Sequence, residues 1–332
     1  MKCSNLAAPA LLCLALGAAP QAFAQRICVF DILGAQGDIY SLMKDYQLAA
    51  NNFGASLELK PYTDEKIAAE DFKAGQCDGV MIMGLRARQF NGFTGSLEAL
   101  GALPSYQALE TVITTLSSPR ASKFMTSGPY EVAGIVPMGA AYLFVNDRTI
   151  DNISKLSGKK FAIMDYDNAQ AKMVQRIGAQ PVASDVTNFA GKFNNGSVDV
   201  VGAPAAAYKP LELQKGLGQR GGVARFPVLQ LTYQLVIRPD RFPEGFGQQS
   251  REFALSQYNR AMSIITQSES EIDKHYWIDI PPEDMEKYSV MLREARISLT
   301  EEGIYDKRMM AVMKRVRCQI DSADAECAQN LE

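Results

Sequence analysis

Histidine is nearly absent from this 332-residue chain, which contains one, His275, and a single tryptophan. Ser-His-Asp catalysis would have to depend on that one histidine. Its neighbours Tyr276 and Trp277 form no catalytic motif, so we interpret it as a packing or surface residue. A metal site of the histidine and cysteine type is excluded by the same scarcity. We expect the protein to use no metal and no other cofactor.

A dinucleotide-binding site is also disfavoured. Gly216-Leu-Gly-Gln-Arg-Gly221 matches the G-x-G-x-x-G pattern. That pattern binds a dinucleotide when a strand precedes it and a helix follows it. Here residues 211–215 have a helical pattern and residues 222–227 an extended one, so we interpret the segment as a glycine-rich turn.

Long apolar runs and strong net charge are absent as well. After residue 24 no stretch reaches the roughly 18 apolar residues that a transmembrane helix needs. The formal net charge of −3 argues against a nucleic acid as partner. No low-complexity tract or long linker appears, so we expect closely joined domains.

The N-terminus has the layout of a secretory signal peptide. Lys2 supplies the positive charge, residues 6–16 form a short apolar run, and Ala22-Phe23-Ala24 is a small-x-small cleavage site. Cys13 does not indicate a lipoprotein, because the large Leu12 precedes it. We expect an exported, periplasmic protein that starts near Gln25. An uncleaved anchor is the alternative.

Four cysteines remain after residue 24: Cys28, Cys77, Cys318 and Cys327. An even number in an exported chain favours disulfides. Cys28 opens the first predicted strand and Cys77 precedes the third, and those strands are neighbours in a doubly wound sheet. A Cys28–Cys77 bond would add about 4 kcal/mol of stability, and Cys318–Cys327 about 2–3 kcal/mol. The alternative is four free thiols.

One phrase, F-x-x-G-x-x-D-x-V, occurs twice, at residues 72–80 and 193–201. Glycine at this place ends a helix in the left-handed conformation, and the aspartate then opens an apolar strand. The preceding segments share a layout of strand, helix, extended stretch and helix. The repeat therefore predicts two α/β lobes that face each other across a ligand-binding cleft.

The rest of the pattern completes this two-lobed α/β fold, in which each lobe contains a doubly wound mixed sheet. Predicted strands include 27–33, 57–61, 79–83, 132–136, 140–145, 159–164, 199–203 and a long one at 225–237, and a helical region covers about 97–117. We divide the chain into a signal peptide (1–24), lobe I (25–140), lobe II (141–233) and a return to lobe I with C-terminal helices (234–332).

Ligands in such sheets lie at the carboxyl ends of the strands, where the strand order reverses. This rule and the expected crossing between lobes nominate Asp31, Gly34, Arg86, Arg88, Tyr142, Asp165, Tyr166, Asn168, Ala203 and Tyr208 as binding residues. We expect Arg86 and Arg88 on a loop after the third strand, with at least one guanidinium facing lobe II. The alternative is two solvated surface arginines.

Several segments resemble the solute-binding proteins of TRAP transporters. They are Lys155-Leu-Ser-Gly-Lys-Lys-Phe161, Ile177-Gly-Ala-Gln-Pro-Val182 and Gly196-Ser-Val-Asp199. Further segments, such as Asp165-Tyr-Asp-Asn-Ala-Gln170 and Ala207-Tyr-Lys-Pro-Leu211, resemble the AdeT-type subgroup, which is commonly labelled as an RND efflux component linked to aminoglycoside resistance. The chain lacks membrane spans and coiled-coil heptads, so a soluble binding protein fits it better than a pump or a membrane-fusion subunit.

The resemblance implies a periplasmic protein of the type II-like binding fold. Such a protein captures a small polar solute between its lobes for membrane transporter subunits. One departure stands out: TRAP binding proteins usually place a carboxylate-gripping arginine near the position of Ala162. Two other functions stay open. One is an exported enzyme that uses Asp165 and Asp167 as an acid–base pair, although helix capping also explains these residues. The other is an envelope adaptor associated with efflux.

Overall fold

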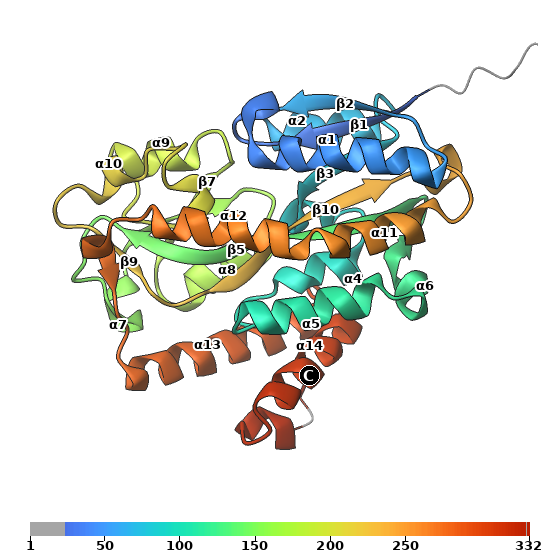
Figure 1. Cartoon of the computed structure of the whole chain (residues 1–332). Helices are drawn as coiled ribbons and strands as arrows, with labels where there is room; N and C mark the ends of the chain where they lie inside the picture. Colours follow the sequence, from blue (N-terminus) through green and yellow to red (C-terminus); the bar gives the residue numbers. More distant parts are fainter. Residues whose placement is uncertain (1–23, 330) are drawn as a thin grey trace, which may run out of the picture.

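The structure, a computed structural model, describes residues 24–329 and 331–332. The predicted signal peptide lies outside the described residues, apart from Ala24. One sheet of eleven strands runs through the molecule, and helices pack around it (Figure 1). Within the described residues, no helix combines the length and the apolar character needed to cross a bilayer.

The central path of the sheet has the order β2-β1-β3-β10-β5-β8-β6-β7. β1 lies parallel to β2 and β3, β6 lies parallel to β7 and β8, and the long strands β5 and β10 run antiparallel to their neighbours. The strands are β1 Gln25–Phe30, β2 Leu57–Tyr62, β3 Gly79–Met83, β4 Thr126–Ser127, β5 Tyr130–Val145, β6 Lys160–Met164, β7 Gln180–Ser184, β8 Val200–Pro204, β9 Gly222–Ala224, β10 Leu229–Ile237 and β11 Trp277–Ile278.

The α-helices are α1 Asp38–Ala50, α2 Glu65–Lys73, α3 Gly84–Ala87, α4 Gly92–Gly95, α5 Tyr106–Ser117, α6 Ser122–Met125, α7 Ile153–Leu156, α8 Asn168–Arg176, α9 Phe189–Asn194, α10 Gln214–Leu217, α11 Phe246–Ser256, α12 Tyr258–Ser270, α13 Pro282–Glu301 and α14 Lys307–Ile320. We call β2-β1-β3 with α1 and α2 lobe I, and β8-β6-β7 with α8 and α9 lobe II. In Figure 1 lobe I lies at the upper right and lobe II at the left, and the long strand β5 extends across both.

Strand β5 joins the two lobes. Residues 131–141 pair with β10, whereas residues 141–145 pair with β8. The two separate strands expected at 132–136 and 140–145 are therefore one strand of 16 residues. Gly139, with φ of +109°, interrupts its extended backbone, which explains why the sequence pattern looked broken there.

The repeated sequence phrase corresponds to a repeated structure. Gly75 and Gly196 both have left-handed backbones, with φ of +77° and +76°. Asp78 accepts a hydrogen bond from Arg26 N (2.9 Å), and Asp199 accepts the equivalent bond from Lys160 N (2.8 Å). Each aspartate thus ties the start of its own strand to the start of a parallel neighbour. The two-lobed interpretation of the repeat is confirmed.

Two sequence-based predictions of elements were wrong. Of the helical region expected at 97–117, only residues 106–117 form an α-helix, α5; a 3₁₀ turn at Ser96–Glu98 precedes it, and Pro104 lies in the gap. The strand expected at 225–237 begins only at Leu229, as β10, and β9 is a separate short strand that ends at Ala224. Arg86 lies on the short helix α3 and Arg88 at its C-terminal cap, not on an open loop.

Both predicted disulfides are confirmed. Cys28 and Cys77 join neighbouring parts of lobe I with Cα atoms 5.8 Å apart, and Cys318 and Cys327 are bonded with Cα atoms 5.7 Å apart. The first pair is buried and the second is partly exposed. The first bond ties β1 to the segment that leads into β3. Asp31 and Gly84 lie at the carboxyl ends of these two strands.

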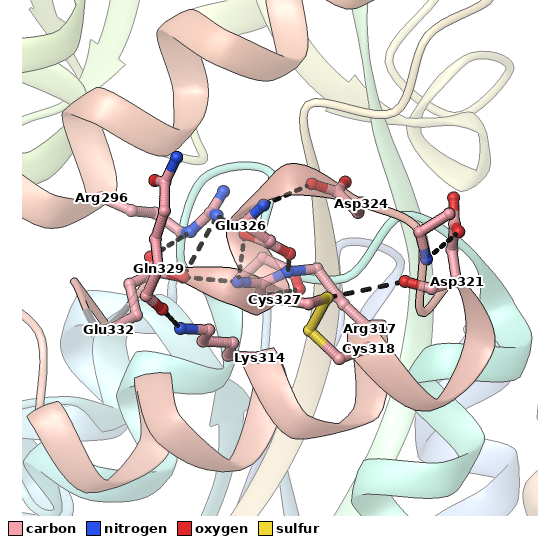
Figure 2. Close-up of a disulfide and its surroundings, with 12 residues drawn as sticks. Arg296, Lys314, Arg317, Cys318, Asp321, Asp324, Glu326, Cys327, Gln329 and Glu332 are labelled. Atoms are coloured by element: carbon pink, nitrogen blue, oxygen red, sulfur yellow. Dashed lines mark hydrogen bonds and ion pairs between the residues drawn. A yellow bond between two sulfur atoms is a disulfide. The ribbon is translucent and has the colours of Figure 1, made fainter.

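The second disulfide lies beside a group of paired side chains that we call the C-terminal clamp. The clamp comprises Arg296, Arg317, Glu326 and Glu332 (Figure 2). Arg296 of α13 donates to Glu332 (2.7 Å), and Arg317 of α14 donates to both Glu326 and Glu332. The same two arginines donate to the carbonyls of Leu100 and Ala102. Buried arginines are stable only when paired in this way. The clamp therefore fixes the tail against the segment between α4 and α5.

Candidate ligand-binding site

A cavity of about 390 Å³ lies where lobe I, lobe II and the crossing strands meet. This volume is in the range of small-molecule sites in proteins. Lobe I contributes the carboxyl end of β1 and the start of α1, and lobe II contributes β6, α8 and β8. Residues of β5, β10, α12 and α13 complete the wall. The topology therefore places the cavity at the strand ends where a ligand was expected.

Most side chains that line the cavity are apolar. Leu, Ile, Val, Met and Phe predominate, and examples are Leu33, Met83, Leu143, Phe161 and Ile264. Leu33 lies in the turn between β1 and α1 and is 48% exposed, although it lines the cavity. An exposed leucine in a turn beside a cavity offers a ligand an apolar contact.

The polar lining residues are few, and most of them are already bonded. Asp31 accepts hydrogen bonds from the backbone N–H groups of Leu33, Ile39 and Tyr40 at 2.9–3.2 Å. Lys209 is paired with Glu271 (3.1 Å), and among the described residues that line the cavity it is the only cation. Burial raises the pKa of Asp31, and its three backbone hydrogen bonds oppose that rise.

Gly34 and Ala162 differ in their position relative to the cavity. Gly34 has a left-handed backbone in the turn after Asp31, with φ of +58°, but does not line the cavity. Ala162 does line it, from β6. A methyl group therefore occupies the place where the resemblance leads one to expect an arginine.

Arg86 and Arg88 belong to an interlobe latch, which we define as Glu65, Arg86, Arg88, Tyr166 and Asp167. The Arg86 guanidinium stacks 3.7 Å from the centre of the Tyr166 ring, and its Nε donates to Glu65 (2.8 Å). Arg88 Nη1 donates to Asp167 Oδ1 (3.0 Å), and Tyr166 Oη donates to Glu65 (3.2 Å). Both guanidinium groups thus contact lobe II, as predicted for at least one, but neither residue lines the cavity.

The polar residues that follow β6 have different positions and roles. Asp167 is buried and caps α8 by accepting a hydrogen bond from Ala169 N (3.0 Å), while it also binds Arg88. Asp165 and Asn168 are exposed. The capping interpretation of Asp167 is therefore confirmed, and its Oδ1 already has two hydrogen-bond donors.

The remaining nominated residues pack beside the cavity without lining it. Tyr142 donates to Glu269 (2.8 Å) and packs edge-on against Trp277. Ala203 pairs with Tyr142 in the sheet and is buried. Tyr208 is buried and stacks on Phe144. Among the nominated residues, Asp31 alone appears in the cavity lining.

Sequence reasoning missed most of the cavity wall. Tyr233 of β10 and Gln170 of α8 line the cavity, as do apolar residues of α12 and α13. In the sequence, the helix residues look like ordinary core positions of amphipathic helices. Leu33 was likewise missed, because the sequence pattern assigned it to the end of the predicted strand 27–33, whereas β1 ends at Phe30.

Glu98 forms a buried acidic position next to the latch. Its Oε1 accepts hydrogen bonds from the backbone N–H and the hydroxyl of Thr232. Its Oε2 has no partner among the described residues. Burial raises the pKa of Glu98 to about 8, so this carboxyl is mostly protonated at neutral pH.

Comparison with known families identifies the kind of protein. The family model described as Solute-binding protein AdeT 1/2 matches residues 48–332. The chain belongs to this solute-binding protein family. It is 52% identical to Probable solute-binding protein AdeT1 of Acinetobacter baumannii, over 92% of this chain and 100% of the relative. It is 27% identical to AdeT2 of the same organism, over 70% of this chain and 98% of the relative.

Solved structures agree on the fold. A TRAP periplasmic solute-binding protein from Desulfovibrio salexigens, with bound orotic acid, aligns with a TM-score of 0.75 and 14% identity, over 90% of this chain and 99% of that one. One from Rhodoferax ferrireducens, with bound malonate, aligns with a TM-score of 0.71 and 11% identity, over 90% and 100%. The chain therefore has the two-lobed α/β fold of the TRAP solute-binding proteins.

The latch gives a first prediction. Asp167→Asn preserves the helix cap, because Asn caps helices about as well as Asp, but removes the charge that Arg88 binds. We expect amide hydrogen exchange in residues 84–88 and 165–170 to become roughly tenfold faster, since a charged hydrogen bond contributes about 1.5–3 kcal/mol. Hydrogen-exchange mass spectrometry measures this change.

Asp151→Asn serves as the control, because it breaks the exposed Lys155–Asp151 pair of the same lobe. Exposed pairs contribute little, so exchange should stay near that of the unmodified protein. Unchanged exchange at both latch segments in Asp167→Asn would show that these contacts do not hold the lobes together.

Glu98 gives a second prediction. Because its pKa is raised in the folded state, its stabilising effect is complete below the unfolded value of about 4.5 and is lost as pH rises through about 8. Between these limits the unmodified protein should lose on the order of 1 kcal/mol of unfolding free energy per pH unit relative to Glu98→Gln. Urea unfolding of both proteins at several pH values measures the difference.

Glu110→Gln, at an exposed site on α5, is the matched control and should follow the unmodified protein at every pH. Parallel pH profiles for Glu98→Gln and the unmodified protein would mean that Glu98 titrates as an ordinary carboxyl.

Proposed function

We propose that this protein captures a small solute in the interlobe cavity and presents it to a membrane transporter from the periplasm. The observation that carries the proposal is the 390 Å³ cavity, which both lobes line. The latch supports it, because contacts between lobes beside a cavity are what a closing binding protein needs. Export is supported by the predicted signal peptide.

The named relatives support the class of function. The curated relatives are described as probable solute-binding proteins, and the solved structures carry bound orotic acid, malonate and acetolactate. TRAP solute-binding proteins work with membrane components, so we infer a transporter as partner of this chain.

The alternatives have weaker support. An acid–base pair of Asp165 and Asp167 would require a free Asp167 carboxylate, but its Oδ1 binds Arg88 and caps α8. An envelope adaptor without a ligand would be favoured by a closed interlobe surface, whereas a cavity is present here. We therefore propose that the protein is not an enzyme.

Within this proposal the nominated residues have different tasks. Asp31 contacts the solute, and Gly34 shapes the turn that presents Asp31. Arg86, Arg88 and Tyr166 close the lobes rather than grip the solute. Tyr142, Asp165, Asn168, Ala203 and Tyr208 stay predictions, and the proposal does not require them to touch the solute.

Gly202 of β8 offers a direct test. It lines the cavity, and a Cβ atom added there would meet no atom within 4 Å. Gly202→Leu should therefore fold normally and fill part of the cavity. We expect a thermal-shift screen of acids, amines, sugars and alcohols to yield at least one stabilising solute for the unmodified protein, and Gly202→Leu to weaken its binding about tenfold or more.

Gly191→Leu is the control, because Gly191 lies on α9 outside the cavity and its added Cβ also meets nothing within 4 Å. It should bind like the unmodified protein. A solute bound equally well by both variants would place the binding site elsewhere, and a screen without any stabilising solute would oppose solute capture itself.

A further inference from the structure

The charge of the cavity wall restricts the solute. Asp31, Asp38 and Glu271 are the acidic residues that line the cavity, and Lys209 is the one cationic residue among the described lining residues. Lys209 is paired with Glu271 (3.1 Å), and its side chain is 60% exposed, so its charge is largely hydrated. The wall therefore presents an excess of negative charge, and an anionic solute would enter without a free cation to bind it. Burying an unpaired carboxylate is strongly unfavourable.

The position of the acidic residues in the cavity wall places a second restriction on the solute. Asp31 lies in the turn that follows β1 and Asp38 is the first residue of α1, so these acceptor groups lie at the same end of the cavity. Asp31 as a residue is 4% exposed, and hydrogen bonds to its carboxylate fix the orientation of that group. A carboxylate can accept further hydrogen bonds but cannot donate any. The matching group on a solute is a hydrogen-bond donor.

The remainder of the wall fits an apolar body. Leu33, Leu143, Phe161, Ile264 and Met291 come from five different elements and all line the cavity. Each buried CH₂ group of a ligand contributes about 0.8 kcal/mol, whereas sugars and short acids would leave this wall without suitable partners.

We propose that the solute is an amphiphile, with an apolar body and a single hydrogen-bond-donating end that is neutral or positively charged. This inference rests on the proposed function and names the class of solute. The apolar body lies against the wall, and the donating end lies at the turn between β1 and α1. Simple organic acids and polycationic aminosugars both fall outside this class, the first by charge and the second by polarity.

The test compares three molecules with the same body: octan-1-ol, octylamine and octanoate. The unmodified mature protein is first loaded with N-phenyl-1-naphthylamine, a fluorescent apolar probe with one N–H donor, and each molecule is then titrated as a competitor at about pH 7.5. We expect octan-1-ol and octylamine to displace the probe, and octanoate to bind about tenfold or more weakly. Within the alcohols, each added CH₂ should tighten binding about fourfold.

Ala162 allows the charge to be reversed. Ala162→Arg adds a cation to the cavity wall, so octanoate should gain affinity and octylamine should lose it. Ala162→Leu adds bulk without charge, so it should weaken the three competitors together and leave their order unchanged. An Ala162→Arg protein that fails to fold would be recognised by its circular dichroism. Gln170→Lys, at another lining residue, would then make the same comparison.

The outcomes separate the two proposals. Octanoate or malonate binding as tightly as octan-1-ol, or alcohol affinities that do not depend on chain length, would overturn the amphiphile inference and leave solute capture in place. Competitors that bind equally well to Gly202→Leu and to the charged variant would lie outside the cavity and would also overturn it. Failure of the probe and of all three competitors to bind would overturn the inference. Solute capture itself would be overturned only if the broader solute screen were also negative.

Discussion

The shared strands β5 and β10 are the constraint on which the rest of the structure depends. β5 pairs with β10 along residues 131–141 and with β8 along residues 141–145, so one continuous backbone belongs to both lobes. Because β10 also pairs with β3, the carboxyl ends of the lobe I strands are held opposite those of lobe II. The cavity occupies the space that this arrangement leaves, and its position follows from strand pairing rather than from any single side chain.

Polar and apolar interactions are separated around this space. The latch connects the lobes outside the cavity lining, through the Arg88–Asp167 ion pair and the stacking of Arg86 on Tyr166, whereas the lining itself is mostly apolar. Charged groups that are buried pay a desolvation cost, which the Glu65–Arg86 and Arg88–Asp167 pairs offset mutually. Closure can therefore be held by protein contacts alone, so the polar part of the solute need not bridge the lobes. This separation is consistent with the methyl group of Ala162 in the cavity wall, because the cations near the cleft are used in closure.

The two-lobed fold could be predicted because its signals are local. The repeated phrase marks a helix end and a strand start, and both copies make the same aspartate-to-backbone bond in the structure. The Cys28–Cys77 pairing followed from the strand order. The late start of α5 was not predicted. The apolar residues on both sides of Pro104 continue a helical pattern, although the proline interrupts the helix.

The cavity could be predicted only in outline. The strand-end rule nominated Asp31, which lines the cavity, whereas the nominated Arg88 pairs with Asp167 and the nominated Tyr208 packs in the core. Lining residues of α12 and α13 follow Asp31 and the other lobe I lining residues by more than 100 positions in the sequence, and only tertiary packing brings them together. A guanidinium near a cleft also has the same sequence signature whether it binds a solute or another lobe.

Native mass spectrometry of the protein purified from its own host, without unfolding, tests the central claim most directly. The account predicts a bound small molecule that is released on denaturation and that is lost from Gly202→Leu but kept by Gly191→Leu. A mass equal to that of the mature polypeptide alone, in a preparation in which the cavity is intact, would contradict it.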